Sequence, residues 1–225
     1  MQTFTAFNDS RVPDAVALRG AANLANAKDR PIGTRRVLAR GEEVFADGDP
    51  CTRFYKVIVG TVRTVRVLAD GRRQIDAFHL PGDVFGLESG GTHRFAAEAV
   101  NDVVLVVYRR NRFSDLVKSD PAFGEQLMSS TLESLDRAHE HAVLLGRKTA
   151  LEKIASFLLN LAGRTAGGDR VELAMQRGDI ADHLGLTIET VSRTLGQMVR
   201  DGLIRLKGGR TVILADKAAL QLLNG

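Results

Sequence analysis

A chain of 225 residues is long enough for one or two domains with a substantial core. Its single cysteine, Cys51, excludes an internal disulfide framework and is typical of a reducing cytosol. The N-terminal segment MQTFTAFNDSRVPDAV lacks a basic region followed by an apolar run, and no apolar stretch approaches the roughly 18 residues that a membrane span needs. These features predict a soluble, cytoplasmic protein that does not bind a membrane.

The excess of basic charge lies in the last third of the chain. The net charge is +4, and residues 1–146 contain 19 basic and 19 acidic side chains, whereas residues 147–225 contain 12 and 8. A localised basic surplus is typical of a protein that binds nucleic acid, although four charges could also form a solvated face. The charge alone leaves both interpretations open.

Short β-rich runs follow an N-terminal arm. Residues 1–30 show no sustained periodicity, so we expect a loosely ordered arm. From Arg35 to Arg110 apolar runs alternate with turn residues; YKVIV and TVRTVRVL are separated by one glycine, and ADGRR carries the Asp-Gly signal of a hairpin. Several such runs at close intervals predict an all-β sandwich or roll.

A long helix is predicted to start at Pro121. No glycine or proline occurs between Gly124 and Gly146, and five residues spaced 4, 3, 4 and 3 apart form a narrow stripe, here called the seam: Met128, Leu132, Leu135, His139 and Ala142. This spacing is typical of a coiled-coil contact between two copies. The alternative is a helix that packs on its own β domain.

A second helix is predicted over residues 147–164, and its broader stripe faces a core: Leu151, Ile154, Phe157, Leu158 and Leu161. The glycines of the following AGRTAGGDR indicate a loop. We therefore place the domain boundary near Gly146.

The segment QRGDIADHLGLTIETVSRTLGQMVRDGLI has the spacing of a helix-turn-helix. Ala181 is small enough for two helices to approach, Gly185 permits a tight turn, and Val191 can fill the joint. The second helix begins at Leu186 or Thr187, and its buried side comprises Val191, Leu195 and Met198.

The outer face of that second helix carries Glu189, Ser192 and Arg193 at positions i, i+3 and i+4. Arginine can donate two hydrogen bonds to guanine, glutamate can accept one from cytosine, and serine can reach a base or a phosphate. The alternative is an i,i+4 ion pair on an exposed helix, worth only about 0.3–0.5 kcal/mol. We predict that these three residues contact DNA bases in the major groove.

Two short β runs around a Lys-Gly-Gly-Arg turn follow in LIRLKGGRTVIL, as in a winged hairpin. Cations and hydroxyls near the base-reading helix suit phosphate contacts, which fix position without reading sequence. The predicted backbone contacts are Arg177, Thr187, Thr190, Lys207 and Arg210.

RGDIADHLGLTIETVSR, together with GDPCTRFYKVIVGTVR and LPGDVFG, resembles the CRP/FNR superfamily of transcription regulators. The resemblance covers nearly everything from Arg35 onward and implies an α+β fold: a cyclic-nucleotide-binding-like β-roll, a long dimerisation helix and a C-terminal winged helix-turn-helix. The expected division is an arm over 1–30, a sensor-like β-roll over 31–120, the dimerisation helix over 121–146 and the DNA-binding domain over 147–225.

Within the superfamily, GRKTALEKIASFLL and LGLTIETVSRTL are most similar to the FixK-type branch of the FNR class. Cyclic-AMP-responsive members usually carry arginine before the recognition glutamate and glycine in place of Ser192, whereas Ile188 precedes Glu189 here. The likeness implies a palindrome of the form TTGAT-N4-ATCAA, activation of low-oxygen or nitrogen-metabolism genes, and contact with RNA polymerase.

Two groups that regulate other members of the superfamily, an iron–sulfur cluster and a cyclic nucleotide, are not expected to bind here. One cysteine cannot supply the four thiolates of an iron–sulfur cluster, and Cys51 is interpreted as an ordinary small side chain. The nucleotide pocket has Gly86, Glu88 and Arg94, but Leu87 interrupts the Gly-Glu pair and Phe95 replaces the hydroxyl that follows the arginine, so Arg94 and Glu88 are expected to pair.

No cofactor or metal is predicted. His139 and His141 are two residues apart and would lie on different helical faces, so they cannot chelate one ion together. The sequence shows no nucleophile elbow, phosphate loop or metal-ligand spacing, and an enzyme is not expected. Two alternatives remain: a regulator of this superfamily gated by a small molecule, and a cyclic-nucleotide receptor module that controls a protein partner.

Overall fold

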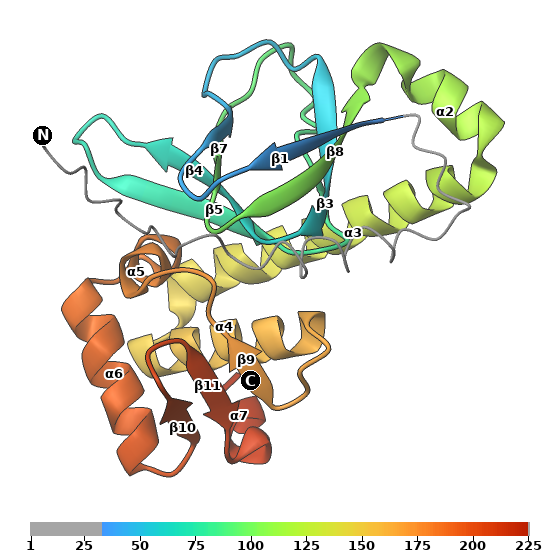
Figure 1. Cartoon of the computed structure of the whole chain (residues 1–225). Coiled ribbons are helices and arrows are strands. Elements are labelled where there is room, and N and C mark those ends of the chain that lie inside the picture. Colours follow the sequence, from blue (N-terminus) through green and yellow to red (C-terminus); the bar gives the residue numbers. More distant parts are fainter. Residues whose placement is uncertain (1–32, 225) are drawn as a thin grey trace, which may run out of the picture. The chain divides into compact units, whose positions relative to one another are not determined.

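The computed structural model describes residues 33–224 (Figure 1). The arm predicted over 1–30 lies outside the described residues. No helix within 33–224 is both long and apolar enough to cross a bilayer.

The N-terminal part of the described chain consists of two four-stranded antiparallel sheets, in the orders β1-β8-β3-β6 and β2-β7-β4-β5. Buried side chains such as Val57, Val62 and Leu105 form the core between them. The predicted Asp-Gly hairpin joins β4 to β5, with Gly71 at a φ of 81°. The strands are β1 Thr34–Leu38, β2 Glu43–Phe45, β3 Arg53–Val59, β4 Val62–Val67, β5 Arg73–His79, β6 Val84–Phe85, β7 Ala96–Ala99 and β8 Val103–Arg109.

The long helix α3 spans Pro121–Arg147 and begins where the sequence predicts. Asp120 caps it by accepting a hydrogen bond from the Phe123 amide at 3.1 Å, and proline occupies its first turn, where no amide hydrogen is needed. A 3₁₀ turn, η1 (Arg110–Arg112), and a short helix, α2 (Phe113–Ser119), precede it and were not predicted.

Helix α4 spans Ala150–Arg164, so the prediction that it begins at residue 147 is wrong. The cause is a capping box: the Thr149 amide donates to Glu152 at 2.7 Å, and the Glu152 amide donates to the Thr149 hydroxyl at 3.4 Å. Helix α3 continues through Gly146 to Arg147, and the two helices are separated by the non-helical residues Lys148 and Thr149. The predicted stripe is confirmed, with four side chains buried and Leu151 partly buried: Ile154, Phe157, Leu158 and Leu161.

The C-terminal part combines helices with a small sheet of order β10-β11-β9 (yellow to red in Figure 1). The hydrophobic core of this C-terminal part is continuous with Ile75 and Phe78 of β5. Strand β9 and helix α7 were not predicted. The elements are β9 Arg170–Glu172, α5 Arg177–Leu184, α6 Ile188–Arg200, β10 Ile204–Lys207, β11 Thr211–Leu214 and α7 Lys217–Asn224.

Candidate DNA-binding surface

Helices α5 and α6 form the predicted helix-turn-helix. Gly185 ends α5 in the left-handed conformation, at φ 61° and ψ 43°, which glycine adopts without a steric penalty. The carbonyl oxygen of Ala181 accepts a hydrogen bond from the Leu186 amide at 3.0 Å, and Val191 is fully buried in the joint. The two helices therefore form one rigid unit around a packed joint.

Thr187 is the N-cap of α6. Its hydroxyl accepts from the Thr190 amide at 3.2 Å, and the two threonine hydroxyls are also 3.2 Å apart. Both threonines, predicted as backbone contacts, thus stabilise the start of the helix and lie at its accessible end. A hydrogen bond from its own backbone amide, followed by one from Thr187, lowers the pKa of Glu189, so this exposed carboxyl stays ionised.

The predicted base-reading residues share the outer face of α6. Glu189 and Arg193 are exposed and Ser192 is partly exposed, whereas Val191, Leu195 and Met198 are buried on the other side. No ion pair links Glu189 with Arg193, and no side-chain hydrogen bond is assigned to Arg193 in the described part of the chain. The i,i+4 ion pair considered above is therefore not formed.

Arg177, at the first position of α5, makes a contact that the sequence did not suggest. Its Nη1 donates to the hydroxyl of Ser192 at 3.2 Å. Because these residues belong to different helices, their proximity depends on the angle at the Gly185 turn. The contact places a second exposed cation on the surface that carries Glu189 and Arg193.

The wing is a three-stranded antiparallel sheet rather than the two-stranded hairpin predicted. Strands β10 and β11 pair from Ile204 to Leu214, and β9 adds to β11. Lys207 and Arg210 flank the glycine turn and are exposed, as predicted. The Leu173 amide donates to the backbone carbonyl of Arg210 at 2.7 Å, which fixes the base of the turn.

The seam of α3 is exposed. Met128, Leu132 and Leu135 keep 62%, 54% and 50% of their surface accessible, and His139 and Ala142 are exposed as well. The helix buries Leu127 and Leu144 against its own chain. One face of α3 therefore packs within the protomer, and the seam lies open on another face.

The region of the β-roll that corresponds to a nucleotide pocket is occupied by its own side chains. Glu88 accepts hydrogen bonds from the Arg94 amide at 2.9 Å and from the Arg94 guanidinium at 3.4 Å, so the predicted pairing is confirmed. The other Glu88 oxygen lies 3.0 Å from His93 Nδ1, and the His93 ring stacks on Phe45 at 3.6 Å. Both oxygens of Glu88 are engaged.

Cys51 is buried, and its Sγ lies 3.1 Å from Nη1 of Arg110 and 3.3 Å from the carbonyl oxygen of Gly86. His141 is directed inward against His183, whereas His139 is exposed, as their spacing predicts. Across residues 33–224 no group of three or more histidine, cysteine or acidic side chains has a metal-binding arrangement.

Comparison with known proteins agrees with this architecture. Residues 152–223 match the model of a Crp-like helix-turn-helix domain, and residues 35–120 match that of a cyclic nucleotide-binding domain. The nitrogen fixation regulation protein FixK of Azorhizobium caulinodans is 47% identical over 198 residues, which cover 86% of this chain and 80% of the relative.

Two further comparisons support the same grouping. The transcriptional activator protein FnrL of Cereibacter sphaeroides is 38% identical over 188 residues, 80% of this chain and 76% of the relative. The solved structure of FixK2 from Bradyrhizobium japonicum superposes with a TM-score of 0.80 at 42% identity, over 86% of this chain and 98% of that one. With the β-roll, the long helix and the helix-turn-helix all accounted for, the chain belongs to the CRP/FNR family of DNA-binding transcription regulators, which are not enzymes.

Proposed function

We propose that this protein is a cytoplasmic, homodimeric activator of low-oxygen or nitrogen-metabolism genes. Each subunit places α6 in the major groove of one half of a TTGAT-N4-ATCAA palindrome, and the bound dimer contacts RNA polymerase. Residues 31–120 serve as the sensor-like domain, 121–146 as the dimerisation helix and 147–225 as the DNA-binding domain. The names of its relatives, nitrogen fixation regulation protein FixK and transcriptional activator protein FnrL, support this role.

The observation that carries the proposal is the outer face of α6. Glu189 and Arg193 project from a helix whose other side is buried, and they are not paired with each other. An exposed acceptor and an exposed planar donor, one turn apart, match the edges of a C·G or G·C base pair. The accessible residues Thr187, Thr190, Arg177, Lys207 and Arg210 supply donors for phosphates.

The seam supports a dimer. Three large apolar side chains, Met128, Leu132 and Leu135, lie at least half exposed in one row on α3. A second copy of α3 would cover them in a two-fold arrangement and would bring two helix-turn-helix units to half-sites about one DNA turn apart. A palindromic operator is the DNA counterpart of that symmetry.

We further infer that neither an iron–sulfur cluster nor a cyclic nucleotide is required. The only cysteine is buried beside Arg110, and one thiolate per chain cannot hold a cluster by itself. Both oxygens of Glu88 are already engaged by His93 and Arg94, and Phe45 and His93 fill the adjacent space with stacked rings.

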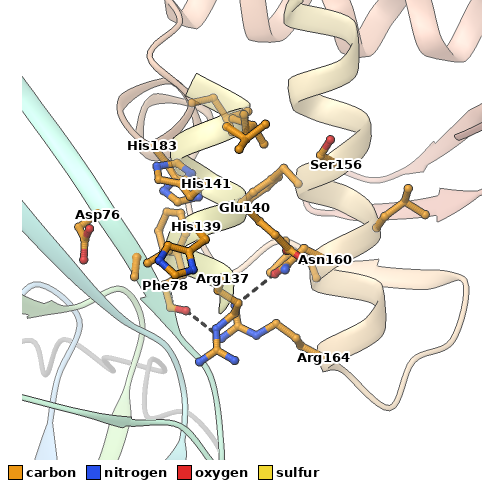
Figure 2. A pocket seen from close by; sticks show the side chains of 18 of the residues that line it. Asp76, Phe78, Arg137, His139, Glu140, His141, Ser156, Asn160, Arg164 and His183 are labelled. Atoms are coloured by element: carbon orange, nitrogen blue, oxygen red, sulfur yellow. Dashed lines mark hydrogen bonds between the residues drawn. The ribbon is translucent and has the colours of Figure 1, made fainter. Parts of the chain in front are cut away.

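A regulator gated by a small molecule is the second candidate, and one cavity favours it. The cavity measures about 740 Å³ and lies between β5, α3, α4 and α5, lined by both apolar side chains such as Phe78 and polar ones such as Asn160 (Figure 2). Cavities of this size hold small ligands in other proteins. An occupant would contact the sensor-like and DNA-binding parts together.

The test is a titration of ligand-free protein, purified in air, against labelled DNA. Three duplexes are compared: the palindrome, the palindrome with one half scrambled, and a fully scrambled sequence. We expect the palindrome to bind about 10³-fold more tightly than the scrambled duplex, with the half-scrambled duplex in between and no effect of cyclic AMP. Equal affinity for all three would contradict the proposal, and binding only after a small molecule is added would favour the second candidate.

A further inference from the structure

The first helix of the helix-turn-helix, α5, is attached to the β-roll at its N-terminal end through Arg63 of β4. Arg63 Nη1 donates to Asp179 Oδ1 at 2.7 Å, while its Nε and Nη2 donate to Glu98 of β7 at 2.9 and 2.5 Å. The side chains of Arg63 and Asp179 are only 16% and 10% exposed. One guanidinium thus joins a carboxylate of the β-roll to a carboxylate of the DNA-binding domain.

The C-terminal end of α5 is attached to β5 through His183. Nδ1 of His183 donates to the carbonyl oxygen of Ile75 at 3.0 Å, and Gln74 Nε2 donates to the carbonyl oxygen of His183 at 3.3 Å. The His183 ring stacks on His141 of α3 at 4.1 Å and meets Phe78 edge-on at 5.2 Å (Figure 2). His183 therefore contacts the β-roll and the long helix together.

Helix α4 is held by the same strand. Arg164 Nη2 donates to the carbonyl oxygen of Phe78 at 3.0 Å and also pairs with Asp83, which in turn pairs with Arg137 of α3. Strands β4 and β5 thus contact α5, and β5 together with Asp83 contacts α4. These attachments leave little freedom for the helix-turn-helix to rotate.

Because the Gly185 turn and the buried Val191 join α5 rigidly to α6, an attachment of α5 also fixes the direction of α6. In the attached arrangement Glu189, Arg193 and Lys207 remain exposed. The contacts to the β-roll therefore do not cover the surface proposed to bind DNA. An autoinhibitory contact would have covered it.

We propose that Arg63 is a positioning residue for DNA recognition: through Asp179 and Glu98 it holds α5 at the angle at which two recognition helices of a dimer fit their half-sites. This inference rests on the proposed dimer and its palindromic operator. Arg63 contacts no DNA itself. Its loss leaves Asp179 without an ion-pair partner and Glu98 with only Arg73, at 3.8 Å. This frees the helix-turn-helix from the β-roll and widens the range of half-site spacings that the dimer accepts.

The test uses full-length protein and four variants. Arg63→Gln removes the charge from the junction, and Asp179→Asn keeps an oxygen that can still accept from the Gln176 amide, as Asp179 does at 3.2 Å. The double variant Arg63→Gln/Asp179→Asn tests their coupling. The matched control is Arg66→Gln, an exposed residue of the same strand to whose side chain no hydrogen bond or ion pair is assigned within residues 33–224.

Two quantities are measured: the affinity for palindromes with spacers of different lengths, and amide hydrogen exchange of residues 73–79 and 177–184. We expect Arg63→Gln to bind the preferred spacer about five-fold or more weakly, to discriminate less between spacers, and to exchange faster in both segments. The double variant should be no weaker than Arg63→Gln, because the pair acts as a unit. Arg66→Gln should behave as wild type.

Three results would overturn the inference. They are unchanged spacer discrimination in Arg63→Gln, faster exchange without any change in DNA binding, and tighter binding by the variant. If the wild-type protein shows no preference for the palindrome, the proposed operator sequence is wrong. The spacer series is then built on the site that wild type selects from a random pool. Failure of the operator and failure of the positioning role are thereby distinguished.

Discussion

Arg193 and Glu189 belong to one exposed face but should read DNA by different chemistry. A guanidinium that bridges guanine O6 and N7 makes two hydrogen bonds in one plane, so Arg193→Ala should cost about 1–3 kcal/mol of binding free energy and relax the preference at one symmetric G·C position per half-site. Arg193→Lys should not fully restore it, because an ammonium lacks the planar fork. Selection of bound sequences from a randomised pool measures both effects.

Glu189→Ala should change base preference in a second way. A carboxylate accepts from an exocyclic amino group, so its removal should relax the choice at a neighbouring position that presents cytosine or adenine. Affinity for random DNA should hold or rise, because a negative charge has left the groove. If the selected sequences of both variants match those of wild type, the assignment of α6 as the recognition helix is wrong.

His79 should make stability depend on pH. Burial lowers the pKa of His79 from 6.5 to about 4. The carboxylate of Asp83 raises this pKa, whereas the guanidinium groups of Arg164 and Arg137 lower it further. Between these two values the unfolded chain binds more protons than the folded chain, so the free energy of unfolding should be at its full value above about pH 6.5 and fall as the pH drops towards 4. The loss from this residue should be about 3 kcal/mol.

Chemical denaturation at fixed protein concentration from pH 7 to 4 measures this dependence. His79→Gln should show a shallower slope than wild type, and the control Arg66→Gln, which alters an exposed side chain away from the seam, should not. Some slope should remain in His79→Gln, because burial also lowers the pKa of His183 to about 3. Identical slopes in wild type and His79→Gln would contradict the assignment of this residue as a buried neutral histidine.

At the scale of elements, the seam of α3 should hold the dimer together. The double substitution Leu132→Lys/Leu135→Lys places two charges on the seam. We therefore expect monomers in sedimentation and loss of operator binding. Ala122→Lys/Gln126→Lys adds the same charge at exposed positions away from the seam and should remain dimeric. A Leu132→Lys/Leu135→Lys variant that stays dimeric would place the interface elsewhere.

The wing should contribute affinity without sequence preference. Lys207→Ala or Arg210→Ala removes one cation at the β10–β11 turn, so binding should weaken about equally on specific and random DNA. The slope of log affinity against log salt should become shallower by about one unit. A loss confined to the specific sequence would show that the residue reads bases instead.

The elements that the sequence predicted are those with a strong local signal. The start of α3 has a capping aspartate followed by proline, and the turn at Gly185 needs a left-handed residue, so both positions were predicted. Strand β9 is three residues long and needs β11 as its partner, and α2 and α7 have seven and eight residues. Such short elements are stabilised mainly by tertiary contacts, which a local pattern does not reveal.

At the scale of the whole molecule, the attachment of α5 to the β-roll was beyond the reach of sequence reasoning. Arg63 and Asp179 are 116 positions apart, and His183 and Ile75 are 108 apart. Nothing in either segment marks the other as a partner, and a charged residue on a strand is more often solvated than paired. Which side chains of α6 are exposed could be predicted from the local spacing, whereas the contacts between α5 and the β-roll required the structure.

Two copies of this chain should together bind a palindrome without any bound effector. Nuclease footprinting of ligand-free protein, purified in air, on DNA that carries TTGAT-N4-ATCAA tests it most directly. We predict protection of both half-sites at the same protein concentration, because one dimer occupies them together. Protection of one half-site before the other, or no protection until a ligand is added, would contradict the account.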